Sequence, residues 1–361
     1  MWGSMLDYYH YTGDATYNDN VLDALLSPLQ TGPNFDYLPP GHASEEGNDD
    51  LGFWGFAVMT AAEMNFPQPR TDVPAWLDLG KNIFNSLVSR WNTDCGGGLI
   101  WQIYEGNPNG LTYKNSVSNG GLFQLAARLY RATGEQLYLD WAARVYDWTA
   151  GVGIIDDNFF VYDGVDTRDS CSLVNKVSFT YSHGIFMYGA AVLAEATGNS
   201  TWLDRATGLV GGVYRFFTPP GATDSIMYEA ACDTVNTCTT DMLVHKATLS
   251  RMMWKTAVIV PALSEAVHKF LDTTVKAAVA TCTAGDDSKQ CGQRWYVGNN
   301  DGSLGLGQQL CALELVQGLL AVDADLPLKG ADIKVVRDKP WESEITKSAA
   351  RSSSTSTTTV I

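Results

Sequence analysis

Basic residues and long apolar runs are both scarce in this sequence. Lysine and arginine total 24 against 40 aspartates and glutamates, a formal charge of −16, and no dense basic run is present that could follow a phosphate backbone. The longest apolar stretches, such as residues 190–194 and 315–322, are far shorter than the roughly 18 to 20 residues that cross a bilayer. We therefore expect neither a nucleic acid partner nor a transmembrane helix.

The chain also lacks a recognisable leader sequence. Residues 1–5 contain no basic region, and Asp7, Tyr8 and His10 interrupt any apolar core that a signal peptide would need. The protein is therefore either cytosolic or has lost its beginning. With 361 residues, of which 45% are hydrophobic, it has ample material for a large folded core.

None of the seven cysteines has the CxxC spacing of zinc or redox sites, and we expect no metal and no cofactor. Two cysteine pairs bracket short polar loops, as is typical of disulfide-bonded proteins. The expected bridges are Cys232–Cys238 and Cys282–Cys291, with Cys95–Cys171 as a candidate third, which would leave Cys311 as a buried thiol. Together with the sequon at Asn199, these pairs favour an extracytoplasmic protein.

A repeat of about 60 residues runs through the chain. A Thr-Gly pair is followed four residues after the glycine by an aromatic residue at Tyr17, Tyr138 and Trp202, and a degenerate copy contains Trp76. This spacing suits two helices and a loop. The helix before each Thr-Gly is poor in charge, which predicts burial, whereas the following helix is charged on one face. Each unit is therefore an inner helix, a Thr-Gly C-cap and an outer helix.

Six such hairpins arranged in a ring predict an all-α (α/α)6 barrel. Inner helices are expected near residues 1–11, 49–64, 119–132, 183–196, 244–259 and 303–322, and outer helices near 17–27, 75–91, 136–150, 201–217 and 262–280. Because only five outer helices accompany six inner ones, we expect that the first outer helix, upstream of Met1, is missing; the alternative is an open ring of eleven helices, which would expose one flank of inner helices to water. Residues 1–325 then form the main domain, and residues 326–361 form a C-terminal extension with a disordered Ser/Thr-rich tail.

The loops between the units are rich in glycine, asparagine and aromatic residues, and they lead into inner helices at the N-terminal end. They should therefore gather on one face of the barrel, where a functional site is expected. Residues 98–104 and 159–162 carry enough β-branched and aromatic residues to form short β-hairpins in these loops.

Asp49 and Asp50 stand side by side at the expected start of an inner helix and are followed by Phe53 and Trp54. By position alone, such an aspartate is a helix cap that answers the positive end of the helix dipole. Two carboxyl groups beside an aromatic surface are also what glycoside hydrolysis needs. The surroundings of the pair favour the second reading.

Other polar and aromatic residues point to the same face. The candidate ligand-binding residues are Asn48, Trp54, Trp101, Asn119, Tyr181, His183, Lys246, Arg251 and Asp301. Each also has a plain structural reading, with histidine and aspartate as caps or turn residues, lysine as a solvated charge and tryptophan as core. Their common location favours a cleft for a neutral polyhydroxyl ligand, because sugar rings stack on flat aromatic faces and hydroxyl groups bind carboxylates and amides.

Several motifs carry a resemblance to a known family: GNDD with FWG at 47–55, SNGG at 118–121, TYSHG at 180–184, HK with LSR at 245–251, and CGQRW, DG and GQQLCALE within 291–314. With them, residues 1 to about 325 resemble glycoside hydrolase family 76, the endo-α-1,6-mannanases, and in particular the fungal cell-wall branch required for attaching GPI-anchored proteins to the wall. Its members usually carry an N-terminal helix and a Trp-Trp-Glu-like loop just before the position of Met1, which agrees with a truncated start.

The resemblance implies a retaining mechanism in which Asp49 is the nucleophile and Asp50 the general acid/base. Adjacent residues on a helix diverge by about 100°, so both can face one sugar only in a loop or first turn. Retention further implies carboxyl groups about 5 to 5.5 Å apart. The acid needs a raised pKa, which burial and the charge of its neighbour would supply.

The implied function is a retaining endo-α-1,6-mannosidase or transglycosidase that acts on α-mannosides of cell-wall mannan or of a GPI-core glycan, with β-glucan as a candidate acceptor. We expect a monomer in the secretory pathway, at the cell surface, plasma membrane or wall. One alternative is a non-catalytic glycan-binding or structural wall protein on the same barrel. A prenyl-processing enzyme is disfavoured because it needs DDxxD, and the fifth position here is Phe53.

Overall fold

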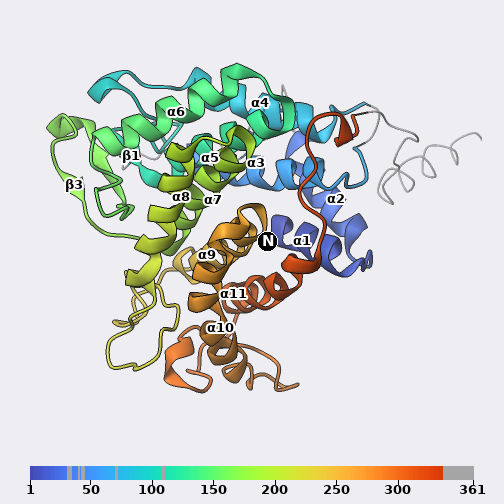
Figure 1. The fold of residues 1–361 in the computed structure, drawn as a ribbon, viewed down its shortest axis with the longest axis vertical. Helices are drawn as coiled ribbons and strands as arrows, with labels where there is room; N and C mark the ends of the chain where they lie inside the picture. Colours follow the sequence, from blue (N-terminus) through green and yellow to red (C-terminus); the bar gives the residue numbers. More distant parts are fainter. Residues whose placement is uncertain (31–34, 40, 42–44, 70–71, 107–109, 336–361) are drawn as a thin grey trace, which may run out of the picture.

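A computed structural model describes residues 1–335 except 31–34, 40, 42–44, 70–71 and 107–109. In this part of the chain, alternate α-helices fall into an inner and an outer ring (Figure 1). The inner helices are α1 (Trp2–Thr12), α3 (Asn48–Glu63), α5 (Ser116–Thr133), α7 (Thr180–Thr197), α9 (His245–Ile259) and α11 (Leu306–Gln317). The outer helices are α2 (Asn18–Leu26), α4 (Trp76–Ser89), α6 (Gln136–Gly151), α8 (Ser200–Gly212) and α10 (Ser264–Ala280).

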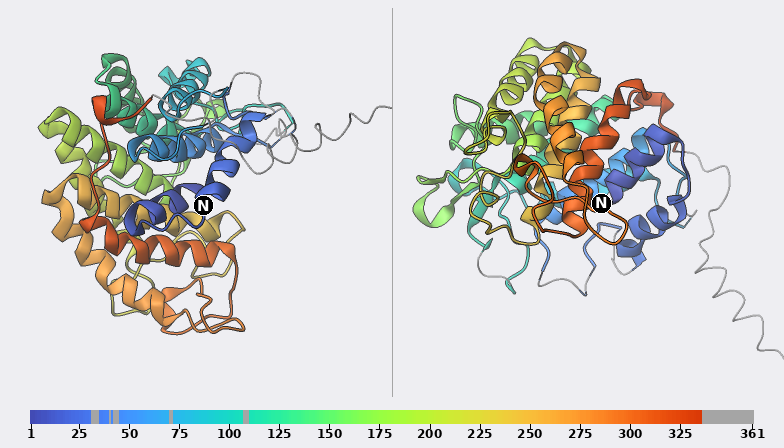
Figure 2. Two further views of the ribbon diagram at one scale, coloured as in Figure 1. Left: turned by 90° about the vertical axis from the view of Figure 1, so that its right-hand side faces the viewer. Right: turned by 90° about the horizontal axis from the view of Figure 1, so that it is seen from below.

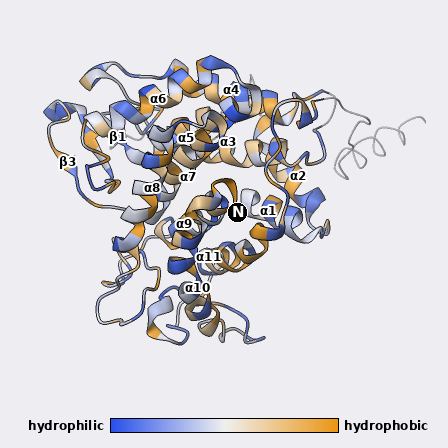
Figure 3. Cartoon of the chain, in the orientation of Figure 1, coloured by the Kyte–Doolittle hydropathy of each residue, from blue (hydrophilic) through white to orange (hydrophobic). Residues whose placement is uncertain are grey.

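The inner ring closes, because each inner helix contacts the next and α11 contacts α1. Each outer helix packs against the inner helix that precedes it, and the long loops gather at one end of the barrel (Figure 2). Apolar residues dominate α3 and α7, in keeping with their burial (Figure 3). These features confirm the predicted all-α (α/α)6 barrel. The predicted tail at 336–361 lies outside the described residues.

The Thr-Gly pairs end the inner helices through two cooperating devices. Gly13, Gly134 and Gly198 adopt left-handed φ angles of 72°, 72° and 63° and return their N–H groups to carbonyls of the last turn. The preceding threonine donates its hydroxyl to the carbonyl four residues earlier and accepts the N–H two residues later, as Thr133 does with Leu129 and Glu135. The repeat therefore encodes a C-cap, as predicted.

Two glycines let the inner helices approach closely near the ends where they begin. A Cβ on Gly52 of α3 would lie 3.1 Å from the Cα of Gly121 on α5, and a Cβ on Gly184 of α7 would lie 3.0 Å from the Cα of Leu249 on α9. Backbones at such separation leave no room for a side chain. The close approach brings the first turns of α3, α5, α7 and α9 toward one centre.

The loops before α5 and α7 form a three-stranded antiparallel sheet of β1 (Tyr113–Asn115), β2 (Gly164–Asp166) and β3 (Val174–Asn175). Lys114 pairs with Val165, and Val165 pairs with Val174. The prediction of short β-strands in these loops is therefore confirmed, but the predicted residues were wrong. Residues 98–104 and 159–162 contribute only isolated bridges, because left-handed φ angles at Gly98 (101°) and Phe159 (59°) interrupt an extended chain.

All three expected disulfides are present, as Cys95–Cys171, Cys232–Cys238 and Cys282–Cys291, and Cys311 is a buried free thiol. The first of them ties the loop before α5 to the loop before α7.

After α11 the chain runs across the end of the barrel where the inner helices finish, from α11 toward α3 and α5 (Figure 1). There Leu328 donates its N–H to the carbonyl of Glu63 at 2.7 Å, and Arg131 donates to the carbonyl of Leu328 at 3.0 Å. Residues 326–335 therefore pack against the barrel. Within the described residues, no helix combines the length and the apolar character that a membrane crossing requires.

Candidate active site

A cavity of about 830 Å³ lies at the end of the barrel where the inner helices begin. Residues at the starts of α1, α3, α7 and α9 line it, together with parts of the loops that lead into α5, α7 and α9, and α11 adds residues on one side. This is the face of the barrel on which the sequence predicts that the loops gather. The cavity therefore draws its lining from repeats that are far apart along the chain.

Asp49 and Asp50 are the second and third residues of α3 and both line this cavity. The backbone N–H of Gly47 donates to Asp50 Oδ2 at 2.7 Å, which caps the helix. The indole Nε1 of Trp101 donates to Asp49 Oδ2 at 3.1 Å, while Asp49 Oδ1 is buried without a hydrogen bond partner. The first-turn position expected for the pair is confirmed, and the capping role coexists with exposure to the cavity.

The two carboxyl groups have raised pKa values. Burial, followed by the neighbouring charge of Asp50, raises the pKa of Asp49 to about 7, although the hydrogen bond from Trp101 opposes the shift. Burial also raises the pKa of Asp50, and the carboxylate of Asp241 adds to this, while the hydrogen bond from Gly47 opposes it. Below about pH 7 Asp49 therefore keeps a proton, and acid/base glycoside cleavage requires one protonated carboxyl group in the pair.

Asn48 fixes the loop that carries Trp101. Its side chain donates to the carbonyl of Ile100 at 2.7 Å and accepts from Arg90 Nε at 2.8 Å, and its backbone N–H donates to the carbonyl of Trp101 at 2.8 Å. Asn48 is 2% exposed and does not line the cavity. It was expected to bind ligand; in the structure it holds Trp101 against Asp49.

Aromatic rings form one wall of the cavity. Phe53 is stacked on Tyr181 with ring centroids 6.4 Å apart and an interplanar angle of 7°, and Tyr181 is stacked on His245 at 3.9 Å and 18°. Trp54, Trp101 and Tyr181, which the sequence marks as candidate ligand-binding residues, all line the cavity. Flat rings beside a carboxyl pair offer the stacking surface that a pyranose ring needs.

Acidic and hydroxyl side chains that the sequence did not single out complete this lining. Asp163, from the loop before β2, accepts from the hydroxyl of Tyr113 at 2.6 Å and from Asn175 Nδ2 at 3.0 Å, and burial raises its pKa. Asp241 lies in the loop before α9. An aspartate next to a glycine, as at Asp163-Gly164, reads as a turn, so no local signal marks it as a cavity residue.

Arg251 lies deeper in the cavity, within a cluster of buried charges. Its Nε is 2.6 Å from Asp7 Oδ2 and 3.6 Å from Glu314 Oε1, and Lys255 Nζ reaches Asp7 Oδ1 at 2.9 Å. Arg251 also donates to the carbonyl of Gly3 at 3.0 Å. The predicted site residue Arg251 therefore lines the cavity, but protein groups already occupy much of its guanidinium.

Two further predicted residues lie away from the cavity on inner helices. Asn119 is fully buried, accepts the N–H of Leu99 at 2.8 Å, and donates to the carbonyls of Leu99 and Asn115. His183 is also fully buried, with Nε2 2.7 Å from the carbonyl of Leu209, and burial lowers its pKa to about 4. Both are structural residues, because their polar atoms face the protein interior.

Lys246 and Asp301 also lie outside the cavity lining. Lys246 is fully buried, its Nζ 3.4 Å from Asp233 Oδ2 and 4.0 Å from the ring centroid of Trp295. Asp301 binds Arg294 Nε at 2.9 Å and the hydroxyl of Ser303 at 2.5 Å, and these bonds hold its pKa near 2 despite burial. Neither side chain is free to bind a ligand, so both expectations are corrected.

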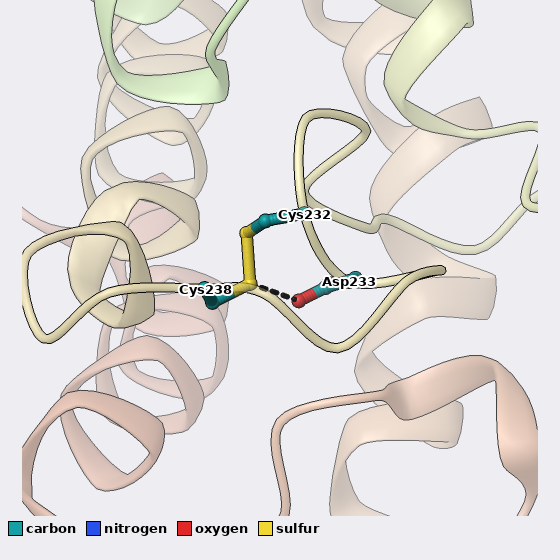
Figure 4. Close-up of side chains that lie close together, drawn as sticks. All are labelled: Cys232, Asp233 and Cys238. Carbon is teal, nitrogen blue, oxygen red and sulfur yellow. Dashed lines mark hydrogen bonds between the residues drawn. A yellow bond between two sulfur atoms is a disulfide. The ribbon is translucent and has the colours of Figure 1, made fainter.

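A metal site was not expected, and one group in the described chain has ligand-like spacing. Cys232, Asp233 and Cys238 place their donor atoms within 4.8 Å of one another. The two sulfurs are joined in a disulfide, and Asp233 Oδ1 lies 3.2 Å from Cys238 Sγ (Figure 4). Because the metal ligand is the thiolate and not the disulfide, this group is a structural cross-link.

Comparison with known proteins agrees with this geometry. The family description "Glycosyl hydrolase family 76" matches residues 1–331. Mannan endo-1,6-alpha-mannosidase DCW1 of Candida glabrata is 45% identical over 318 residues, which cover 87% of this chain and 70% of that protein. The crystal structure of Dfg5 from Chaetomium thermophilum in complex with glucosamine has a TM-score of 0.87 and 34% identity, and the match covers 97% of this chain and 86% of that one.

A more distant structure shares the fold. It is an inactive variant of the α-1,6-mannanase GH76A from Salegentibacter, with two consecutive aspartates replaced by asparagine, in complex with α-1,6-mannotriose. Its TM-score is 0.70 at 20% identity, with 89% of each chain covered. The family match spans nearly all of the described residues, so this chain belongs to glycosyl hydrolase family 76.

Proposed function

We propose that this protein cleaves α-1,6-linked mannosides with retention of configuration and passes the mannosyl group to water or to a second sugar. The observation that carries the proposal is the pair of adjacent carboxyl groups, Asp49 and Asp50, in the first turn of α3 at the cavity. The linkage is proposed from the names of the relatives, among them DCW1 and the mannanase that holds α-1,6-mannotriose. The donor is wall mannan or the mannose part of a GPI-core glycan, and a β-glucan is a candidate acceptor.

The proposed reaction proceeds through a covalent intermediate. Asp50 donates a proton to the glycosidic oxygen while a carboxylate oxygen of Asp49 attacks the anomeric carbon, so that the bond to the leaving sugar breaks and a β-mannosyl ester forms. Asp50, now ionised, then takes a proton from water or from an acceptor hydroxyl. The oxygen of that group attacks the anomeric carbon and releases Asp49, which restores the α configuration.

Exposure supports this division of roles, whereas the raised pKa of Asp49 favours Asp49 as the acid. Asp50 is the more exposed of the two and can meet an incoming water or acceptor. Burial and the charge of Asp50 raise the pKa of Asp49 to about 7, so Asp49 carries a proton below this pH. Asp49 can act as nucleophile only if this proton passes to Asp50 when substrate binds. In the reverse assignment, Asp49 is the acid/base and keeps its proton, and Asp50 is the nucleophile.

Rescue by azide separates the two assignments. Asp49→Ala and Asp50→Ala would each be assayed with an aryl α-1,6-mannobioside that carries a good leaving group. If Asp49 is the nucleophile, azide should give a β-mannosyl azide with Asp49→Ala and an α-mannosyl azide with Asp50→Ala. The opposite pair of products would exchange the roles. Full activity of either variant without azide would contradict the proposed mechanism.

Product analysis decides the donor and the acceptor. The wild-type protein would be incubated with α-1,6-mannotetraose or a GPI-core glycan, alone and with a β-glucan oligosaccharide. Free mannosides indicate hydrolysis, and a new mixed glycan indicates transfer. Binding without either product, in the wild-type protein as in Asp49→Asn, would instead favour the non-catalytic glycan-binding alternative.

We also propose that the protein acts as a monomer in the secretory pathway and at the cell surface, plasma membrane or wall. Three disulfides support the compartment, because such bridges persist in oxidising environments. Light scattering would test the monomer, and localisation of a tagged protein would test the compartment.

A further inference from the structure

His245 occupies a special position in the cavity. It is the first residue of α9, it lines the cavity, and its side chain is 10% exposed. One ring face is stacked on Tyr181 at 3.9 Å, and Phe179 meets the ring edge-on at 5.3 Å. Since Nδ1 is a buried atom, Nε2 on the other side of the ring is the nitrogen that can face the cavity. The aromatic contacts leave the imidazole little freedom to turn.

A buried carboxylate lies behind this ring. Glu229 is fully buried, and its Oε2 is 3.6 Å from His245 Nδ1. The carboxylate also accepts from the backbone N–H and the hydroxyl of Thr180, the first residue of α7, at 3.2 and 2.5 Å. A carboxylate can only accept hydrogen bonds, so it favours a proton on the ring nitrogen that faces it. Nδ1 has no other partner in the described structure.

The loop that carries Glu229 is anchored to α9 at the residue next to His245. Asp233 Oδ2 accepts the backbone N–H of Glu229 at 2.8 Å, and the same oxygen lies 3.4 Å from Lys246 Nζ in a buried ion pair. The Cys232–Cys238 disulfide closes the same loop (Figure 4). Glu229 and His245 are thus fixed relative to each other by a second contact, between Asp233, four residues after Glu229, and Lys246, the residue after His245.

We propose that Glu229 holds His245 in the tautomer protonated at Nδ1, so that Nε2 accepts a hydrogen bond from a hydroxyl group of the bound mannoside. His245 is then a positioning residue. It orients a sugar against the aromatic wall of Phe53 and Tyr181, beside the carboxyl pair. The role in sugar binding rests on the function proposed above, whereas the tautomer is a property of the free protein.

The tautomer can be measured directly. ¹⁵N NMR of the histidine rings distinguishes a protonated from an unprotonated nitrogen, and His245→Asn identifies the relevant signals among the five histidines. At a pH high enough to leave the ring neutral, we expect the proton on Nδ1 in the wild type. Glu229→Gln should lower the share of this tautomer, because an amide can donate to Nδ1. A proton on Nε2 in the folded wild type would overturn the proposal.

Kinetics with α-1,6-mannobiosides test the hydrogen bond from Nε2. The side-chain amide of glutamine reaches the place of Nε2, whereas that of asparagine reaches only the place of Nδ1. Loss of one hydrogen bond should raise KM about three- to tenfold in His245→Asn, with kcat nearly unchanged, and His245→Gln should recover most of the loss. Equal KM values for the two variants would overturn the proposal.

A control variant tests whether the effects are specific to His245, and the NMR experiment separates a failure of this proposal from a failure of the proposed function. His268 lies on α10, is paired with Asp272 at 2.9 Å and is 35% exposed, so His268→Gln should leave KM and the His245 signals unchanged. Thermal unfolding of each variant would confirm that it is folded. If the wild-type protein turned over no α-1,6-mannoside, the proposed function would fail, while the NMR result would still decide the pairing of Glu229 with His245.

Discussion

Trp101 donates its indole N–H to Asp49 at 3.1 Å, so a residue that we propose to stack on a sugar also lowers the pKa of a proposed catalytic carboxyl group. The bond connects the loop before α5 to the first turn of α3. Asn48 maintains the connection from the buried side, through its bonds to Ile100 and Arg90.

Trp101→Phe should preserve the aromatic surface and remove this bond. The hydrogen bond stabilises the ionised form of Asp49 and lowers its pKa, so its loss should raise that pKa. A hydrogen bond to a charged group contributes about 1.5–3 kcal/mol, which corresponds to a shift of roughly 1–2 pH units. The alkaline limb of the pH–rate profile should move upward by about this amount. An unchanged limb would show that the bond does not control the pair.

The wild-type profile itself should be bell-shaped, because the pair must hold one proton to act. The pKa of Asp49, about 7, is the value at which the pair loses its last proton, so activity should fall as the pH rises through about 7. On the acid side, activity should fall as the second carboxylate is protonated. Initial rates on an aryl α-mannoside between pH 3 and 9 would show both limbs. A rate that stays constant from pH 6 to 9 would contradict the shared proton.

Asp49→Asn should abolish turnover and increase stability at high pH. In the folded protein the pKa of Asp49 is about 7, against 3.8 ordinarily, so the folded state binds this proton more tightly than the unfolded chain. Ionisation of Asp49 therefore destabilises the folded state. This destabilisation is absent at low pH, grows from pH 3.8 upward, and is complete above pH 7. Removal of the carboxyl should stabilise the protein by at least about 1 kcal/mol at pH 8 and much less at pH 4. Denaturant unfolding at both values would test this, with Asp157→Asn, in a loop, as a control.

The helices could be predicted because their signals are local. Thr133 and Gly134 cap α5 with bonds that reach no further than the adjacent turn, so the repeat alone locates the end of the helix. The position of Asp49 and Asp50 could be predicted for a similar reason, since the first turn of a helix lets both side chains reach one cavity.

The remaining lining could not be predicted, because it depends on side-chain direction and on long-range contacts. Lys246 and His245 are adjacent at the start of α9, but a rotation of about 100° per residue turns Lys246 toward Asp233 and leaves His245 in the cavity. Asp163 reaches the cavity only because β2 pairs with β1 and β3. The spacing of residues in the sequence reveals neither the direction of these side chains nor the pairing of the strands.

Arg128→Ala should be among the most destabilising substitutions in the barrel. Arg128 and Glu63 form a bidentate pair at 3.0 and 2.7 Å, with side chains only 2% and 5% exposed, and Arg128 also donates to the carbonyl of Phe56. Removal of the arginine leaves a buried carboxylate without a countercharge, which costs about 3–5 kcal/mol.

The matched control is Lys81→Ala, which removes an ion pair with Glu135 between side chains that are 31% and 49% exposed. Solvent screens such a pair, so this change should cost less than about 1 kcal/mol. Denaturant unfolding of the two variants measures the difference. Because the pair joins α3 to α5 beyond the cavity, the folded fraction of Arg128→Ala should keep the wild-type KM. Equal stability losses in the two variants would mean that water reaches the buried pair.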